Sequence, residues 1–229
     1  MNNKGYFLPA SILIAALLIS GSVIYTTGQK VDTNDQPNQA QESSQEIEPI
    51  TEADHIRGAG VDAPVKIVEY SDPECPYCSK FHLDMKKVIQ DYGDQVAWVY
   101  RHFPLDSLHS KARKEITATE CAYDLGDPDI FWGYLDRLYE VTPSNNGLDL
   151  TRLPEIAEYV GLDADEFNEC LESGKFDEKI EAQYQDAVQS GGTGTPYVLV
   201  MKEDEVLGTL PGALPYEQLS EIIDQLLNQ

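Results

Sequence analysis

Two cysteines separated by two residues, Cys75 and Cys78, are the side chains of this sequence best suited to chemistry. The β-branched stretch 65–70 ends shortly before them, and helical spacing of apolar residues begins at Cys78. Cys75 therefore falls at a helix N-terminus, where unpaired backbone N–H groups and the helix dipole favour a thiolate. Pro76 suits the first helical position, because an N–H would have no partner there. The spacing predicts a reversible dithiol/disulfide couple, with Cys75 as the exposed attacking sulfur and Cys78 as the buried resolving sulfur.

Two other interpretations of the cysteine pair stay open. Half of a zinc site would need a second pair, and the remaining cysteines, Cys121 and Cys170, are 49 residues apart. A purely structural disulfide in a short loop would also satisfy the spacing. We favour the redox couple, and we expect no metal and no other cofactor.

The apolar pattern around this pair predicts both strands and helices. Strands are expected at 65–70, 96–103, 196–201 and 206–210. Helices are expected from Cys78 to Gly93, in several pieces over 107–190, and at 216–227. The order is strand, helix, strand, a helical block, two strands and a helix, which indicates an α/β domain of ordinary size.

The composition narrows the class of protein. Of the 229 residues, 41% are hydrophobic, which is enough for one full core, too little for an all-membrane protein and too much for a disordered one. Asp and Glu number 40 against 16 Lys and Arg, so the formal charge is −24. Such a charge repels phosphate backbones and argues against nucleic acid as a partner. It most often keeps a domain soluble; a calcium site or adaptation to salt is the alternative, but no Asp-x-Asp-x-Asp-Gly loop is present.

The N-terminal part of the chain differs in composition from the rest. Residues 6–25 carry no charge and are long enough to cross a bilayer as a helix, and the preceding Lys4 favours an exported remainder. We expect residues 1–27 to be a membrane anchor, with a cleaved signal peptide as the alternative. Residues 28–53 are acidic and rich in Gln, and we expect a disordered linker there, followed by one domain over 54–229.

Four further motifs accompany Cys75-Pro76-Tyr77-Cys78 along that domain. They are Asp54-His55-Ile56-Arg57-Gly58 with Asp62-Ala63-Pro64, Glu69-Tyr70-Ser71-Asp72, Arg101-His102-Phe103-Pro104-Leu105, and Gly192-Thr193-Gly194-Thr195-Pro196. With these motifs in this order, the chain resembles the DsbA-like thiol–disulfide oxidoreductases of the thioredoxin superfamily. The resemblance implies a thioredoxin fold with a helical insertion, at about 105–190, between the second and third predicted strands.

The resemblance also implies a substrate-binding surface. It implies that the Thr195–Pro196 bond is cis and faces the cysteines, so that the Thr195 backbone could pair with an extended substrate held against Cys75. Pro76 and Tyr77 would belong to the same surface. Without the resemblance, Pro196 is interpreted as an ordinary proline at the start of a strand.

Glu69 lies six residues before Cys75, where relatives of this kind carry a buried acid. Such an acid could carry a proton to or from Cys78. The alternative is a surface carboxylate on an edge strand. A lysine that accompanies the acid in some relatives has no match here, since the strand expected at 96–103 contains none.

The residues next to Cys75 indicate a disulfide of intermediate potential. Strongly oxidising relatives carry His between the cysteines, and Tyr77 has no positive charge to offer in its place. Asp72 and Glu74 add negative charge, which should hold the pKa of Cys75 higher than in those relatives. A less stabilised thiolate means a less oxidising disulfide.

The other two cysteines, Cys121 and Cys170, fall in the helical block. Lone cysteines are usually independent buried thiols, and that alternative stays open. In an oxidising compartment a close pair would join, and we favour a structural disulfide between two helices.

We interpret the chain as a membrane-tethered, extracytoplasmic thiol–disulfide oxidoreductase. Its substrates would be reduced exported proteins, and a membrane or soluble redox partner would recycle it. A disulfide isomerase or reductase would use the same chemistry. A thioredoxin-like module without catalysis, which holds unfolded chains or binds a thiophilic metal, is the alternative from another class.

Overall fold

The computed structural model describes residues 46–228. The segment predicted as a membrane anchor or signal, residues 1–27, lies outside them. Within 46–228, no helix combines the length and the apolar character needed to cross a bilayer.

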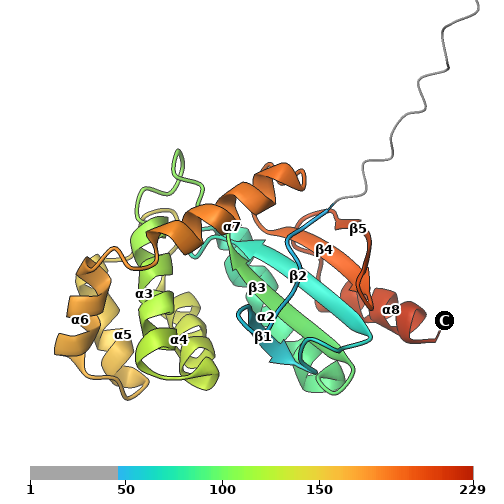
Figure 1. The fold of residues 1–229 in the computed structure, drawn as a ribbon, viewed down its shortest axis with the longest axis horizontal. Helices are drawn as coiled ribbons and strands as arrows, with labels where there is room; N and C mark the ends of the chain where they lie inside the picture. The colour runs from blue at the N-terminus through green and yellow to red at the C-terminus, as the bar shows by residue number, and fades with distance from the viewer. Residues whose placement is uncertain (1–45, 229) are drawn as a thin grey trace, which may run out of the picture. The chain divides into compact units, whose positions relative to one another are not determined.

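Strands and helices follow one another along the chain as Figure 1 shows. The strands are β1 (His55–Gly58), β2 (Val65–Ser71), β3 (Val96–His102), β4 (Tyr197–Lys202) and β5 (Glu205–Leu210). The helices are α2 (Pro76–Tyr92), α3 (Ala112–Leu125), α4 (Pro128–Val141), the 3-10 helix η1 (Leu150–Arg152), α5 (Leu153–Tyr159), α6 (Ala164–Glu172), α7 (Asp177–Gln189) and α8 (Tyr216–Leu227). The helical insertion lies where it was predicted, between the strands that the structure has as β3 and β4.

Strand β1 is missing from the predicted order. Its four residues are too few to show the alternation of a strand, and it exists through antiparallel pairing with β3, with His55 opposite Tyr100. Gly58 ends it with a φ of +106°, and a Cβ there would lie 2.2 Å from the Val96 carbonyl oxygen. Only glycine therefore lets β1 end this close to β3.

The five strands form one sheet in the order β1-β3-β2-β4-β5. β2 and β3 run parallel and are joined by α2, while the other neighbouring pairs are antiparallel. Every residue of β2 and β3 is buried, because α2, α4 and α8 cover one face of the sheet and α7 covers the other. The carboxyl ends of β2 and β3 meet at one edge, where the chain turns into α2.

Helices α3 to α6 form the insertion (Figure 1). It has a hydrophobic core of its own. Ile116 of α3, Tyr134 of α4 and Phe167 of α6 are among its fully buried side chains. A disulfide joins Cys121 of α3 to Cys170 of α6, with the sulfur atoms 2.03 Å apart. Helix α7 leads from the insertion back to the sheet.

The linker expected over 28–53 reaches into the described residues, and there the structure differs from the expectation. The Glu48 N–H donates to Asp186 of α7 at 2.9 Å, and Arg101 of β3 donates to the Glu48 carbonyl at 2.9 Å. Ile47 and Ile50 pack against the core on the α7 face. These two apolar side chains and the buried guanidinium fix residues 46–53 to the domain, whereas their acidic composition alone indicated a free tether.

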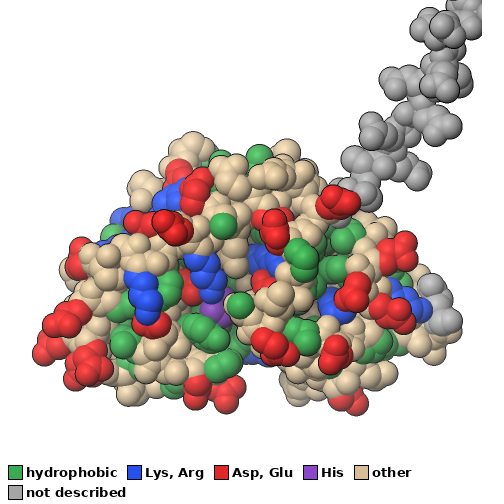
Figure 2. All heavy atoms as spheres, viewed as in Figure 1, with side chains coloured by type: hydrophobic (Ala, Val, Ile, Leu, Met, Phe, Trp, Pro, Cys, Tyr) green, Lys and Arg blue, Asp and Glu red, His purple; other side chains and the backbone are tan. Residues whose placement is uncertain are grey.

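The acidic side chains are distributed rather than gathered on the face that Figure 2 shows. They lie on the insertion helices and around the sheet, with Lys and Arg side chains between them. On this face the negative charge therefore forms no single acidic patch.

Replacing Cys121 and Cys170 together with Ala should lower stability. The bridge closes a loop with a sequence separation of 49, and such a loop is worth roughly 2 to 4 kcal/mol because it restricts the unfolded chain. The melting temperature should fall by roughly 5 to 15 °C. Thermal unfolding followed by circular dichroism measures it, and an unchanged melting temperature would contradict the role of the bridge.

Candidate active site

The turn between β2 and α2 places the Cys75–Cys78 pair at a helix N-terminus. Cys75 is the N-cap residue of α2, with extended backbone angles, and its side chain makes no capping hydrogen bond. Pro76 occupies the first turn, as the sequence predicted. The N–H groups of the first turn are therefore left to face the Cys75 sulfur.

The two thiols are free and differ in accessibility. Cys78 is completely buried, and Cys75 is only 4% exposed. The expectation of an exposed Cys75 is thus wrong in degree, because Thr195 covers it: the Cys75 Sγ donates to the Thr195 carbonyl oxygen at 3.4 Å. Tyr77 is 66% exposed and Pro76 is also exposed, so the surface beside Cys75 is open to a partner.

The structure has Thr195 and Pro196 where the resemblance implied. Their peptide bond is cis, and the Thr195 carbonyl faces Cys75 across the site. Helix α2 lies on one side of the sulfur and this loop, which precedes β4, on the other.

The surroundings of the two sulfurs shift their pKa values in opposite directions. The hydrogen bond from the Cys78 thiol lowers the pKa of Cys75 to about 6, with further contributions from the Thr195 side chain and from the N–H groups of Cys78 and Tyr77. Burial and the neighbouring Cys75 sulfur raise the pKa of Cys78 well above its usual value. Cys75 is therefore the more readily ionised sulfur of the pair, and the raised pKa of Cys78 keeps it a thiol at neutral pH.

Asp72 and Glu74 have hydrogen-bond partners that the sequence did not predict. Both are buried, and their carboxylates accept backbone N–H groups: Asp72 that of Leu105 at 2.8 Å, and Glu74 that of Asn146. The local contacts of Cys75 outweigh any repulsion from these charges, since the net shift of its pKa is downward.

Glu69 is fully buried in the centre of the sheet, which excludes the alternative of a surface carboxylate on an edge strand. Its two oxygens accept hydrogen bonds from Ser71 Oγ at 2.7 Å and Trp98 Nε1 at 2.8 Å. Burial raises its pKa to about 8 despite these two bonds. Glu69 in turn helps to raise the pKa of Cys78, so the two groups sense each other's protonation.

The surroundings of Glu69 include side chains that the sequence did not predict. Trp98 of β3 donates to the Glu69 carboxylate through Nε1. Tyr139 of α4 lies 3.0 Å from Ser71 Oγ and 3.2 Å from the Tyr100 hydroxyl. No local signal identifies Tyr139, because only the fold brings α4 beside β2.

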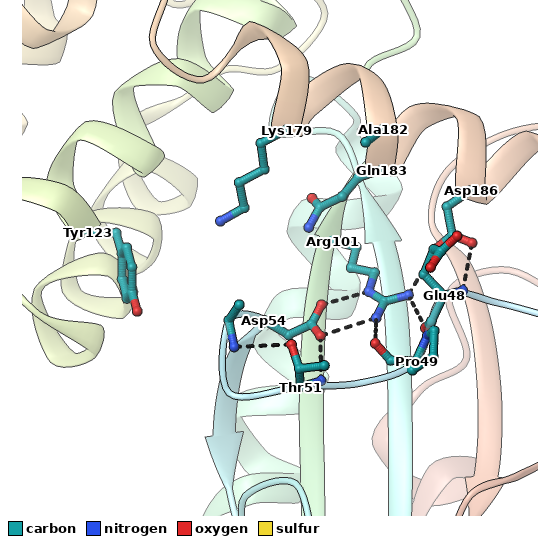
Figure 3. Close-up of a pocket in the computed structure, with 11 residues that line it drawn as sticks. Glu48, Pro49, Thr51, Asp54, Arg101, Tyr123, Lys179, Ala182, Gln183 and Asp186 are labelled. Atoms are coloured by element: carbon teal, nitrogen blue, oxygen red, sulfur yellow. Dashed lines mark hydrogen bonds and ion pairs between the residues drawn. The ribbon is translucent and has the colours of Figure 1, made fainter.

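A cavity of about 440 Å³ between α7, the segment 48–54 and Tyr123 of α3 is not this site (Figure 3). It contains neither Cys75 nor Cys78. The Arg101 side chain in its wall has no free donor, because its N–H groups are used by Asp54, Asp186, Tyr70 and the carbonyls of Glu48 and Pro49.

Among the described residues, His55, His102 and Glu120 form one buried group of metal-binding residue types. Both His Nε2 atoms hydrogen-bond to Glu120 Oε1, at 2.8 and 2.7 Å. The ammonium of Lys179 lies 2.8 Å from Glu120 Oε2 and 3.2 Å from His55 Nε2. Because this ammonium would repel a metal ion, we interpret the group as a buried hydrogen-bond network, with one ion pair between Lys179 and Glu120, that joins the insertion to the sheet.

In the reduced protein, the absorbance of the Cys75 thiolate at 240 nm should titrate with a midpoint near the pKa of about 6. Cys78→Ala removes the hydrogen bond that contributes most to this low pKa, so the midpoint should rise by about one unit. A wild-type midpoint near that of a free thiol, about 8.5, would contradict this description of the site.

Glu69→Gln should stabilise the protein more at pH 8 than at pH 5. The wild-type pKa of Glu69 is about 8 when folded and near 4.5 when unfolded, so the wild type loses stability as pH rises through that window. The variant does not titrate, and its advantage should grow by about 3 kcal/mol between the two pH values. Denaturant unfolding of both proteins in the same redox state measures this, and an advantage independent of pH is the contrary result.

The sequence and the fold of this chain are similar to those of known proteins. A family model described as Thioredoxin matches residues 51–225. The structure of DsbA2 from Pseudomonas aeruginosa is similar, with 26% identity, coverage of 77% of this chain and 96% of that one, and a TM-score of 0.64. The alpha-DsbA1 of Wolbachia pipientis, at 24% identity, covers 81% of this chain and 96% of its own with a TM-score of 0.69. BdbD from Bacillus subtilis, also at 24% identity, covers 79% and 96% with a TM-score of 0.66.

Other relatives match a shorter part of this chain than the family model does. A Na(+)/H(+) antiporter, NhaA 3 of Salinispora tropica, is 35% identical over 147 residues, which is 64% of this chain and 21% of that protein. This chain thus spans about a fifth of that relative's length, and the name of the antiporter is not carried over to it. The match to the family model covers most of the chain, and the fold is the one predicted from the motifs. The chain belongs to the thioredoxin family, with the DsbA-like fold of the thiol–disulfide oxidoreductases.

Proposed function

We propose that this protein is an extracytoplasmic thiol–disulfide oxidoreductase that oxidises exported proteins. The observation that carries the proposal is the difference between the two sulfurs. Cys75 has a pKa lowered to about 6 and lies beside an exposed surface, while the buried Cys78 has a raised pKa. A couple built in this way has one sulfur for attack by a partner and one that leaves and returns inside the same site.

The proposed reaction starts from the Cys75–Cys78 disulfide. A substrate thiolate attacks Cys75 Sγ, the disulfide breaks, and Cys78 leaves as a thiolate that takes up a proton. A second substrate thiolate then attacks the substrate sulfur of the mixed disulfide and releases the Cys75 thiolate. The substrate gains a disulfide, and the two electrons remain in the Cys75–Cys78 dithiol.

Glu69 is the proposed proton donor to Cys78. Its pKa of about 8 keeps it protonated at neutral pH, and it helps to raise the pKa of Cys78. Around Cys75, the proposed substrate-binding groups are the Thr195 backbone, the buried Pro196 and the exposed Pro76 and Tyr77 side chains. The exposure of Pro76 and Tyr77 and the 3.4 Å contact of Cys75 with Thr195 support this assignment.

The direction of exchange follows from the stability of the thiolate. A lowered pKa of Cys75 stabilises the reduced form and so makes the disulfide oxidising. The value of about 6 lies between the roughly 3.5 of a strong oxidant and the roughly 7 of thioredoxin, which supports an intermediate potential. Isomerisation or reduction would use the same residues with the dithiol as the resting form.

The location is part of the proposal. A Cys121–Cys170 disulfide is suited to an oxidising compartment outside the cytoplasm. Reduced exported proteins are the proposed substrates, and a membrane or soluble redox partner is proposed to reoxidise the dithiol. Tethering through residues 1–27, or their cleavage as a signal, stays a prediction.

Cys75→Ala should abolish oxidative refolding of a reduced disulfide protein, because no other sulfur in the site has a lowered pKa. Cys78→Ser should instead accumulate mixed disulfides at Cys75 when it is given an oxidised substrate or glutathione disulfide, since Cys75 can attack these disulfides and no Cys78 thiol is present to release them. Recovery of the refolded protein's activity measures the first outcome, and mass spectrometry detects the mixed disulfides. The Cys121→Ala/Cys170→Ala protein is the control and should keep its exchange activity.

The same experiment separates the alternatives. A non-catalytic module that only holds unfolded chains would form no mixed disulfides with Cys78→Ser. Refolding activity that persists in Cys75→Ala would overturn the proposal.

A further inference from the structure

The turn that presents Cys75 is fixed from one side by Asp72. One carboxylate oxygen accepts the Glu74 N–H at 2.8 Å. The other accepts the Leu105 N–H at 2.8 Å and contacts His109 Nδ1 at 2.9 Å. Asp72 thereby joins the turn to the loop that follows β3.

Glu74 fixes the same turn from the other side. Its carbonyl accepts the Asn145 N–H at 2.8 Å, and its buried carboxylate accepts the Asn146 N–H. Both donors belong to the loop after α4, so the residue next to Cys75 is bound to the helical insertion. Two successive N–H groups of this loop therefore bond to Glu74, one to its carbonyl and one to its carboxylate.

The backbone of this loop adopts an uncommon conformation. Ser144, Asn145 and Asn146 have φ values of 59°, 53° and 63°, although none of them is glycine. Three successive left-handed residues persist only where surrounding contacts hold them, and here those contacts include Glu74.

A second buried carboxyl group faces Glu74. Both side-chain oxygens of Glu115 on α3 and Oε1 of Glu74 are buried, and no donor among the described residues hydrogen-bonds to any of these three atoms. Burial, followed by hydrogen bonding to Glu74, raises the pKa of Glu115 to about 10. Glu115 is then a neutral acid whose hydroxyl can donate a hydrogen bond to Glu74 Oε1, while Glu74 Oε2 accepts the Asn146 N–H.

The other titratable groups near this pair come from three elements. They are Asp72 in the turn, Lys111 at the N-terminus of α3, and Tyr134 of α4. Lys111 favours ionisation of Glu115 and Asp72 opposes it.

We propose that Asp72, Glu74 and Glu115 are positioning residues for Cys75, which clamp its turn between two loops, with Glu115 as an uncharged donor to Glu74. This inference rests on the proposed function, in which Cys75 is the reactive sulfur. The clamped turn keeps Cys75 aligned with the N–H groups of α2 and with Thr195. Loss of the clamp lets the sulfur leave this alignment, and the pKa of Cys75 rises.

Two substitutions of Glu115 test the clamp. Glu115→Gln keeps a donor toward Glu74, and Glu115→Leu removes it at similar size. The thiolate titration of reduced protein at 240 nm and the rate of iodoacetamide alkylation at pH 6 report on Cys75. Glu115→Gln should match wild type within about twofold, while Glu115→Leu should react about fivefold more slowly, as a pKa rise of one unit requires.

The Cys121→Ala/Cys170→Ala protein is the matched control, because it also loses a contact of α3 but not one of the clamp. Its alkylation rate should equal that of wild type. If Glu115→Leu melts lower yet keeps the wild-type rate, or if Glu115→Gln is as slow as Glu115→Leu, the positioning role is wrong.

A second measurement needs only the isosteric variant. The melting temperature of Glu115→Gln should exceed that of wild type by a margin that grows by about 5 °C or more between pH 5 and pH 8. The reason is that wild-type Glu115 is already largely ionised in the unfolded chain at pH 5 but stays protonated when folded, so folding takes up a proton and becomes less favourable as pH rises. If the difference in melting temperature does not grow with pH, Glu115 is not a neutral hydrogen-bond donor in the folded protein. Absence of disulfide transfer by wild-type protein would instead count against the proposed function alone, since these readouts need no substrate protein.

Discussion

The stabilised thiolate of Cys75 is the interaction on which the rest of this structure depends. The sulfur needs the first turn of α2, the thiol of Cys78 and the Thr195 loop at the same time, and each comes from a different part of the chain. The buried parallel pair β2 and β3 sets where α2 begins, and β4 brings the Thr195–Pro196 segment against it. The insertion contributes through α4, whose Tyr139 and following loop contact the residues around the turn.

The site is built from buried acids whose burial has a cost in stability. Burial raises the pKa values of Glu69 and Glu115 to about 8 and about 10, so both are neutral in the folded protein at pH 7. Their contribution is greatest at low pH and is lost as pH rises through the interval between the unfolded and folded values. Buried acids of this kind lower the stability of the folded protein, and they are found at functional sites, where their chemistry is needed.

The sequence allowed prediction of the local chemistry but not of the long-range contacts. The redox pair was predicted from two cysteines separated by two residues at a strand-to-helix transition, with Pro76 in the first helical position. The structure has all three residues at the start of α2. The cis bond before Pro196 came only from the resemblance. The burial of Cys75 by Thr195, the strand β1 and the docking of residues 46–53 depend on partners far away in the chain, and no local pattern reports such pairings. Asp72 and Glu74 were predicted as charges near Cys75, and only the fold shows their carboxylates to be acceptors of backbone N–H groups.

The reduction potential of the Cys75–Cys78 couple, measured by equilibration with glutathione buffers, tests the central claim most directly. A thiolate stabilised to a pKa of about 6 predicts a potential between the roughly −270 mV of thioredoxin and the roughly −120 mV of the strongest oxidant of this kind. A potential at or below about −270 mV would show a dithiol that reduces its partners, and it would contradict the proposal that this protein is an oxidase.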